Sequence, residues 1–223
     1  FSAVAVAADF SDAVELTVAN GAYTREGALV VARGASVTPK INWIDGLAWN
    51  VKGVHTTEFT FNGDSQYFTF NAATGAVKVA KDAPGGMYEL TYTAERYDEE
   101  GNWIGYIDDT LEILVVEELV AGVELLNANE GYMFGAPIGN KIVLDKAKGI
   151  TSFTIAAYAV NGDADYQEFA FTSTANENFT VVDNGNNTAT ITLIGDTGNV
   201  TVTATAMDGS KKSVKVTVAA GIA

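Results

Sequence analysis

The sequence predicts an all-β protein made of two antiparallel sandwiches in tandem. In the stretch 198–221, apolar residues alternate with polar ones on both sides of a Met-Asp-Gly-Ser turn. Strict alternation around a D-G turn is typical of an antiparallel hairpin with one buried face. Thr, Val, Ala, Gly and Asn dominate the composition, and the 223 residues include only 3 prolines, which indicates β-structure. This length is enough for two sandwiches of about 100 residues each.

The first half of the chain contains six apolar runs that we expect to form strands. Turn-forming sequences separate them, such as Asn-Gly-Asp at 62–64 and Asp-Ala-Pro-Gly-Gly at 82–86. The segment 11–20 is different, because its D-x-x-E pattern before Gly21 matches a helix cap and predicts one short helix. The six predicted strands are 28–33, 56–62, 67–71, 76–80, 88–97 and 103–117.

The second half repeats this arrangement of short strands with turns about every 8–12 residues, which is the pattern of an immunoglobulin-like sandwich. No Gly/Ser-rich or Pro-rich linker separates the halves at Glu117 and Glu118, so we expect the two domains to be joined almost directly. We predict an extended N-terminal segment at 1–12, one sandwich at 13–118 and another at 119–223. The predicted strands of the second half are 120–126, 141–144, 151–160, 168–173, 179–182, 188–194, 200–206 and 214–219.

Each half resembles a known kind of surface domain. The sequences Phe-Thr-Phe-Asn-Ala-Ala-Thr-Gly-Ala-Val-Lys-Val at 68–79 and Tyr-Glu-Leu-Thr-Tyr-Thr-Ala at 88–94 resemble the central part of cadherin-like repeats. Phe-Thr-Ser-Thr at 171–174, Phe-Thr-Val-Val-Asp-Asn-Gly at 179–185 and the hairpin at 198–218 resemble bacterial group 2 immunoglobulin-like domains. The resemblances imply adhesion, spacing or assembly on a cell surface.

Two departures from the cadherin pattern argue against its calcium sites between domains. Val-Val-Glu-Glu-Leu-Val at 115–120 replaces the acidic D-x-N-D-N linker, and Lys-Asp-Ala-Pro-Gly-Gly at 81–86 stands where a D-R-E motif is expected. A separate calcium candidate is the turn that carries Asp163, Asp165 and Glu168, because hard cations bind several oxygens at short range. This turn lacks D-x-D-x-D-G spacing, and acidic residues are common in exposed turns, so we expect no obligatory cofactor.

The composition excludes several other classes of function. A formal net charge of −15 argues against nucleic acid, because phosphate binding needs a basic surface. No run of 18 apolar residues occurs, so we expect no membrane span. With no cysteine and a single histidine, His55, zinc sites and Cys–His or Ser–His pairs lack partners. No G-x-S-x-G motif is present either, and we predict a non-catalytic protein.

The tryptophans and two tyrosines have two interpretations. Trp43, Trp49 and Trp103, together with Tyr97 and Tyr106, are able to form a platform on which sugar rings stack, which makes surface glycans a candidate partner. The alternative is structural, because sandwiches bury a tryptophan against the opposite sheet. In that interpretation Tyr97 and Trp103 pair across the two strands of one hairpin.

Residues 1–8 predict a strand that joins subunits. They are small and largely apolar on both faces, with Ala3, Ala5 and Ala7 on one side and Val4 and Val6 on the other. Such a strand suits a groove closed on both sides, and donation to the next subunit would generate a head-to-tail filament. The alternative is pairing within its own domain. The segment also resembles the end of a secretory signal, and we expect an exported chain.

The leading hypothesis is a non-catalytic extracellular structural or adhesive protein, a filament or surface-layer subunit that assembles with copies of itself. One alternative is a carbohydrate-binding or spacer module of a larger secreted protein. The other is an immunoglobulin-like domain of a phage virion.

Overall fold

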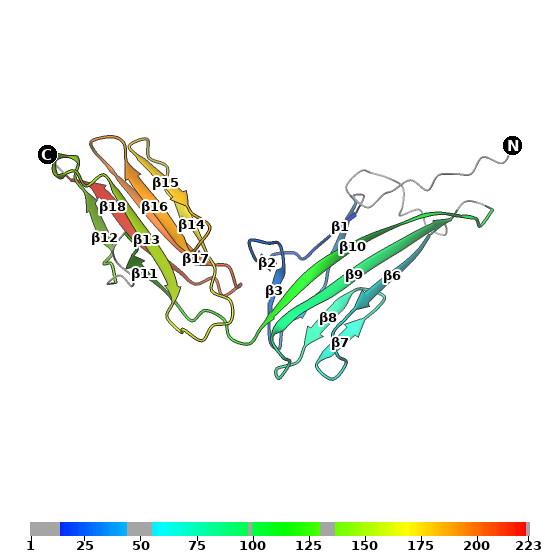
Figure 1. The fold of residues 1–223 in the computed structure, drawn as a ribbon. Helices are drawn as coiled ribbons and strands as arrows, with labels where there is room; N and C mark the ends of the chain where they lie inside the picture. The colour runs from blue at the N-terminus through cyan, green and yellow to red at the C-terminus, as the bar shows by residue number, and fades with distance from the viewer. Residues whose placement is uncertain (1–13, 44–54, 98–99, 130–136, 222–223) are drawn as a thin grey trace. The chain divides into compact units, whose positions relative to one another are not determined.

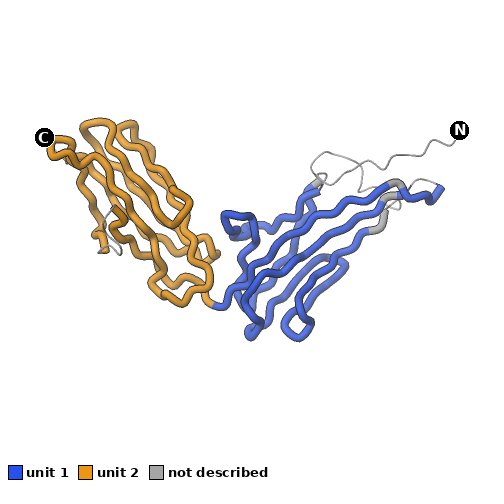
Figure 2. The backbone as a smooth tube through the Cα atoms, in the orientation of Figure 1, with its two compact units in different colours: residues 1–117 blue, residues 118–223 orange. Residues whose placement is uncertain are grey.

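The computed structural model describes residues 14–43, 55–97, 100–129 and 137–221. The chain divides into two compact units, unit 1 at 1–117 and unit 2 at 118–223 (Figure 2). Both units are built from β-strands, which confirms the predicted all-β class (Figure 1). Among the described residues, no helix has the length and apolar character needed to cross a membrane.

Unit 1 contains a five-stranded sheet in the order β2-β3-β10-β9-β6. Two smaller sheets, β1-β5 and β4-β8-β7, follow one another directly because β5 begins three residues after β4 ends. Their buried side chains meet those of the five-stranded sheet in one core. The strands are β1 (Val14–Thr17), β2 (Ala22–Tyr23), β3 (Leu29–Ala32), β4 (Ser36–Val37), β5 (Lys40–Trp43), β6 (His55–Phe61), β7 (Phe68–Asn71), β8 (Ala76–Val79), β9 (Gly86–Tyr97) and β10 (Trp103–Val116).

The two longest described strands of unit 1 are β9 and β10 (Figure 1). They pair antiparallel along nearly their whole length, with one register shift between Trp103 and Gly105. Because side chains alternate across a strand, Leu90 and Tyr92 of β9 and Ile107 of β10 face the core and are almost completely buried. Burial raises the pKa of the Tyr92 hydroxyl, because the ionised form is poorly solvated there.

Unit 2 is a complete two-sheet sandwich. Its sheets have the orders β11-β13-β16-β15 and β12-β18-β17-β14. The predicted hairpin is present, because β17 pairs with β18 from Asn199↔Ala219 to Thr205↔Ser213, and the apolar residues of β17 face the core. The elements are β11 (Val123–Asn127), β12 (Lys141–Leu144), the short 3-10 helix η1 (Lys146–Lys148), β13 (Ser152–Ala159), β14 (Phe169–Ser173), β15 (Phe179–Asp183), β16 (Thr188–Leu193), β17 (Asn199–Ala206) and β18 (Ser213–Ala220).

The two units share one topology. In unit 1, β1 lies in one sheet, and β3 lies in another sheet, where it pairs with the last strand, β10. In unit 2, β11 lies in one sheet, and β12 lies in the other, where it pairs with the last strand, β18. These pairs, β3 with β10 and β12 with β18, are parallel, so the sandwiches are not antiparallel throughout as the sequence suggested. A split first strand of this kind lets one chain segment close both sheets of an immunoglobulin-like sandwich.

The helix predicted at 11–20 is wrong over its described part. Residues Val14–Thr17 form β1, which pairs antiparallel with β5. Val14 and Leu16 are buried while Glu15 between them is exposed. This alternation with a period of two residues is that of a strand and not of a helix. Cross-strand pairing and core burial outweigh the weak local preference of a capping pattern.

Candidate functional site

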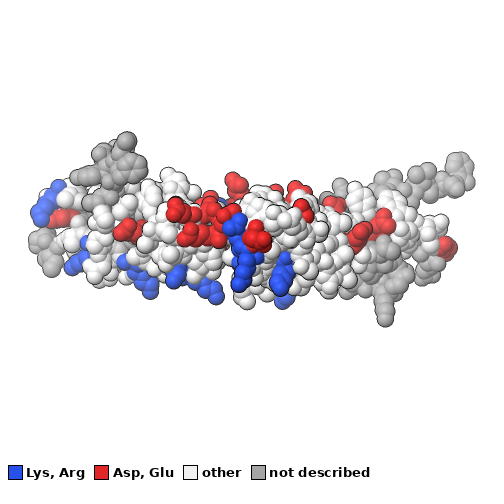
Figure 3. Space-filling view, turned by 90° about the horizontal axis from the view of Figure 1, so that it is seen from below, with Lys and Arg blue, Asp and Glu red and all other residues white. Residues whose placement is uncertain are grey.

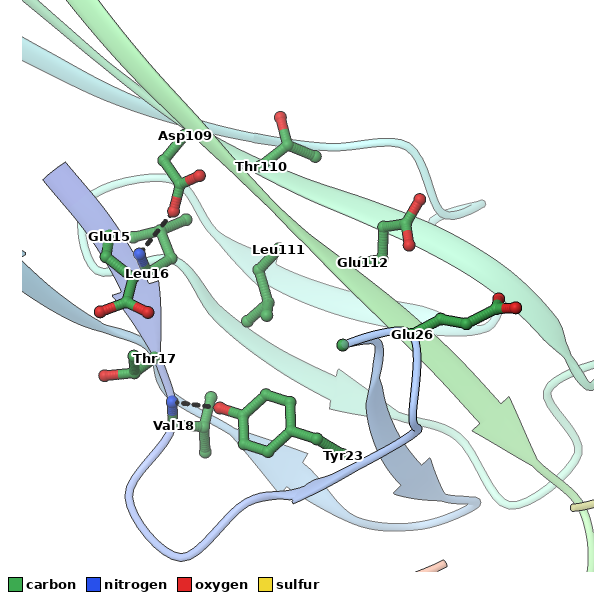
Figure 4. Close-up of a pocket in the computed structure, with 11 residues that line it drawn as sticks. Glu15, Leu16, Thr17, Val18, Tyr23, Glu26, Asp109, Thr110, Leu111 and Glu112 are labelled. Carbon is green, nitrogen blue, oxygen red and sulfur yellow. Dashed lines mark hydrogen bonds between the residues drawn. The ribbon is translucent and has the colours of Figure 1, made fainter. Parts of the chain in front are cut away.

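A groove in unit 1 lies between β1, β2 and residues 109–112 in the middle of β10, and its volume is about 660 Å³ (Figure 4). Leu16 and Leu111, which are nearly buried, form its apolar floor. Four acidic residues line it, namely Glu15, Glu26, Asp109 and Glu112, and no lining residue is basic. The groove therefore has an apolar floor and an acidic rim, which disfavours an anionic occupant.

Among the described residues, no strand pairs with one edge of β10 ahead of Ile113, beside this groove. β10 pairs with β3 only over Ile113–Val116, while its opposite edge is paired with β9 from Trp103 to Val115. Val116 carries its carbonyl on the β3 side, where it accepts a hydrogen bond from Arg33. Because backbone groups alternate between the two edges of a strand, the even-numbered residues 106–112 direct their N–H and C=O groups to the open edge. The groups of Tyr106, Asp108 and Thr110 have no backbone partner within the described parts of the chain, whereas Glu112 adjoins the first bridge to β3, Ile113↔Leu29.

Side chains hold β1 beside β10 where a backbone ladder is missing. The backbone N–H of Leu16 donates to Oδ2 of Asp109 at 2.5 Å, and the N–H of Val18 donates to the hydroxyl of Tyr23 at 2.9 Å. Figure 4 shows both bonds at the margin of the groove. β1 is thus fixed next to β10 without using the free backbone groups of its edge. An edge with unpaired groups is a template for another strand.

The acidic turn predicted as a calcium candidate is arranged differently from an ion site. Asp163 is exposed, Asp165 accepts a hydrogen bond from the N–H of Glu118 at 3.0 Å, and Glu168 accepts one from the hydroxyl of Tyr166 at 2.6 Å. Over the described residues, no group of three or more acidic, histidine or cysteine side chains is placed to hold a metal ion. The structure therefore uses two of the three carboxylates to bind other parts of unit 2.

The first residues of unit 2 are fixed by a cluster of polar side chains that the sequence reading missed. The N–H of Val120 donates to Oδ2 of Asp208 at 2.5 Å, and the N–H of Ala121 donates to Oδ1 of Asn161 at 2.7 Å. Nδ2 of Asn161 donates in turn to the carbonyl of Leu119 at 3.0 Å. Asp208 is 2% exposed and belongs to the Met-Asp-Gly-Ser turn of the β17–β18 hairpin. In the sequence it was therefore interpreted only as a turn residue, and its bond to Val120 was missed. Figure 3 shows a group of acidic side chains near the middle of its view.

Trp103 and Tyr106 are exposed, contrary to the structural interpretation of the tryptophans. Trp103 is 48% and Tyr106 is 56% exposed, and their rings stack with centroids 6.5 Å apart. Tyr97 lies directly opposite Trp103, as that interpretation expected, and its hydroxyl donates to Oε2 of Glu95 at 2.8 Å. This bond to a carboxylate raises the pKa of Tyr97.

The other residues named from the sequence are outside this part of the structure. Trp43 ends β5 and His55 begins β6. Trp49 and the N-terminal residues Ala3, Val4, Ala5, Val6 and Ala7 lie outside the described residues.

Comparison with known proteins gives structural neighbours and no family. No protein-family model and no curated protein match the chain. Among solved structures it is similar to protocadherin gamma B2 extracellular domains 3–6 (14% identity, 87% of this chain and 43% of that chain, TM-score 0.31). It is also similar to the human desmocollin-1 ectodomain (10% identity, 86% and 39%, TM-score 0.31). A third similar structure contains the fibronectin(III)-like modules of Clostridium thermocellum CbhA (14% identity, 93% and 94%, TM-score 0.39). The chain spans less than half the length of the two cadherin chains, and the resemblance to bacterial group 2 domains stays a prediction.

Proposed function

We propose that this chain is a non-catalytic structural or adhesive subunit of an extracellular surface. It assembles with copies of itself when an extended segment of one copy adds to the open edge of β10 in another. The observation that carries the proposal is the run of backbone groups at residues 106–110, beside the groove, that have no backbone partner among the described residues. Main-chain hydrogen bonds along such an edge supply affinity, and alternate side chains in a groove set the register.

The donor in this proposal is the segment Ala3–Ala7. Its side chains are small and uncharged, so they match an apolar floor without adding charge to an acidic rim. Like charges opposed across an interface cost binding energy, and this segment carries no charged side chain. The acidic rim also limits pairing with unrelated strands, a common protection of exposed sheet edges.

A head-to-tail contact of this kind does not close on itself. The surface that donates differs from the surface that accepts, so each added subunit leaves one donor and one acceptor free. Such a contact produces a filament or lattice. This geometry favours a structural role over that of a phage decoration domain or of a monomeric spacer.

Electron microscopy and light scattering of the purified chain test the proposal. We expect the intact chain to form filaments or oligomers whose mass rises with concentration, and a chain lacking residues 1–8 to remain a folded monomer. Circular dichroism confirms that the shortened chain keeps its β-structure. Filaments that persist after the deletion, or an intact chain that stays monomeric at all concentrations, would overturn the proposal.

The open edge is tested separately by proline. Thr110→Pro removes an N–H group that faces the groove and leaves the ladder to β9 complete, because Thr110 does not hydrogen-bond to β9 through its backbone. Thr57→Pro is the matched control. Thr57 lies on β6, at the opposite edge of the same sheet, and its N–H is also turned away from β9. We expect Thr110→Pro to abolish assembly and Thr57→Pro to preserve it; the reverse result would move the acceptor to β6.

A further inference from the structure

The outer face of the β10-β9-β6 sheet carries an exposed aromatic platform near the β9–β10 hairpin. Trp103 and Tyr106 project from β10 and stack with an interplanar angle of 28°. Tyr97 of β9 stands directly opposite Trp103. About half of each stacked side chain is exposed, an unusual amount of aromatic surface to leave in water unless a partner covers it.

Hydrogen-bonding groups lie directly beside this platform. Glu95 is the cross-strand neighbour of Tyr106, and Thr93 is the neighbour of both Asp108 and Glu58. Glu95, Thr93 and Glu58 also line a hollow of about 340 Å³. The hydroxyl of Tyr97 donates to the carboxylate of Glu95, which holds that carboxylate next to the rings.

We infer that this face binds a neutral oligosaccharide. A pyranose ring presents a face of C–H groups, which packs on an aromatic ring, and a rim of hydroxyl groups, which donate to carboxylates and pair with threonine hydroxyls. Trp103 and Tyr106 supply the stacking surface, and the hollow at Glu58, Thr93 and Glu95 receives hydroxyl groups of the next sugar. A few polar groups beside an aromatic surface are the usual composition of a small-ligand site.

The charge of the face decides between classes of glycan. The described outward positions of β6, β9 and β10 carry glutamates and an aspartate, and none of them is basic. Glu112 even stands directly opposite Glu89, which concentrates negative charge further. Uronates, sulfated sugars and teichoic phosphates would be repelled, so the ligand is a sugar without negative charge. This site goes beyond the proposed assembly, because its rings lie outside the groove that accepts the strand.

A printed array of neutral and acidic glycans, followed by calorimetric titration with the best-bound neutral oligosaccharide, tests the inference. The chain lacking residues 1–8 serves as the sample alongside the intact chain, so that glycan binding is measured with and without assembly. We expect binding to neutral hexose or N-acetylhexosamine oligomers and none to uronates. Trp103→Ala and Tyr106→Ala should each weaken it at least about tenfold, and Trp103→Phe should restore part of the loss.

Tyr158→Ala provides the matched control, because Tyr158 is also an exposed strand tyrosine, at 45%, but belongs to unit 2. It should leave the affinity unchanged. The inference is overturned if the array shows no neutral glycan bound, if acidic glycans are preferred, or if Trp103→Ala binds as tightly as the parent. An intact chain that stays monomeric but still binds the glycan would refute the proposed function alone.

Discussion

Removing the buried carboxylate of Asp208 should destabilise unit 2 by about 2–4 kcal/mol. Its two oxygens accept hydrogen bonds from the N–H groups of Val120, at 2.5 Å, and Ser210, at 2.9 Å. In Asp208→Ala the N–H of Val120 is left without a partner in a site that is 1% exposed, which costs about 1–3 kcal/mol. The loss of the bond to Ser210, which water replaces in part, adds about 1 kcal/mol.

Calorimetry of the intact chain measures this loss. Because all three tryptophans belong to unit 1, tryptophan fluorescence follows unit 1, and the melting transition without a fluorescence change belongs to unit 2. For a domain of this size about 1 kcal/mol corresponds to roughly 4 °C, so the unit 2 transition should fall by roughly 8–16 °C. Asp208→Asn should lower the unit 2 melting temperature by less than Asp208→Ala does. The amide oxygen of Asn accepts one of the two hydrogen bonds, while its NH₂ group faces the other donor.

Asp196→Ala is the control for this prediction. The Asp196 side chain is 86% exposed, and it pairs with Lys146 at 3.0 Å; an exposed pair contributes about 0–1 kcal/mol. A structural role of Asp208 in unit 2 is refuted if Asp208→Ala shifts the unit 2 transition no more than Asp196→Ala does, or if it shifts the unit 1 transition equally.

Three further outcomes follow from the structure. Gly75→Ala should lower the unit 1 melting temperature by more than 5 °C, because Gly75 has φ +68 and a Cβ there would lie 2.6 Å from the ring of Phe59; differential scanning calorimetry measures it. Asp145 has a lowered pKa because Lys148 donates to its carboxylate, so its contribution to stability is present above the unfolded pKa near 4 and is lost as the pH falls through the lower folded value. In Asp145→Asn, the melting temperature of unit 2 should therefore fall less between pH 5 and pH 2 than it does in the parent chain. Finally, EDTA should change neither melting temperature, and a rise on adding calcium would contradict the assignment of Asp165 and Glu168 to internal hydrogen bonds.

Periodicity alone predicted most of the fold. The alternation in β16, β17 and β18 places every second side chain in the core, and the predicted strands of both halves correspond to observed ones. The strands that were missed, β1, β2, β4 and β5, contain only two to four residues. So short a segment carries too little pattern to distinguish a strand from a loop, and partners distant in the chain decide its structure.

The candidate site was less accessible to sequence reasoning. That β10 has an open edge depends on where β3 stops pairing, at Ile113, and no local pattern encodes that end point. The role of Asp208 was concealed for a similar reason, since its partner Val120 lies 88 residues away. Exposure of Trp103 depends on the face to which it points, because it stands opposite Tyr97 on the outer face of the sheet, beside the register shift between Trp103 and Gly105.

Mixing two variants that cannot assemble alone tests strand addition at β10 most directly. Thr110→Pro retains the donor segment and lacks the acceptor edge, while the chain without residues 1–8 retains the edge and lacks the donor. Strand addition at this edge requires each variant alone to be a monomer near 23.4 kDa. Their mixture should give a one-to-one dimer of about twice that mass by light scattering, with no larger species. A mixture that stays monomeric, or either variant that forms filaments by itself, would contradict it.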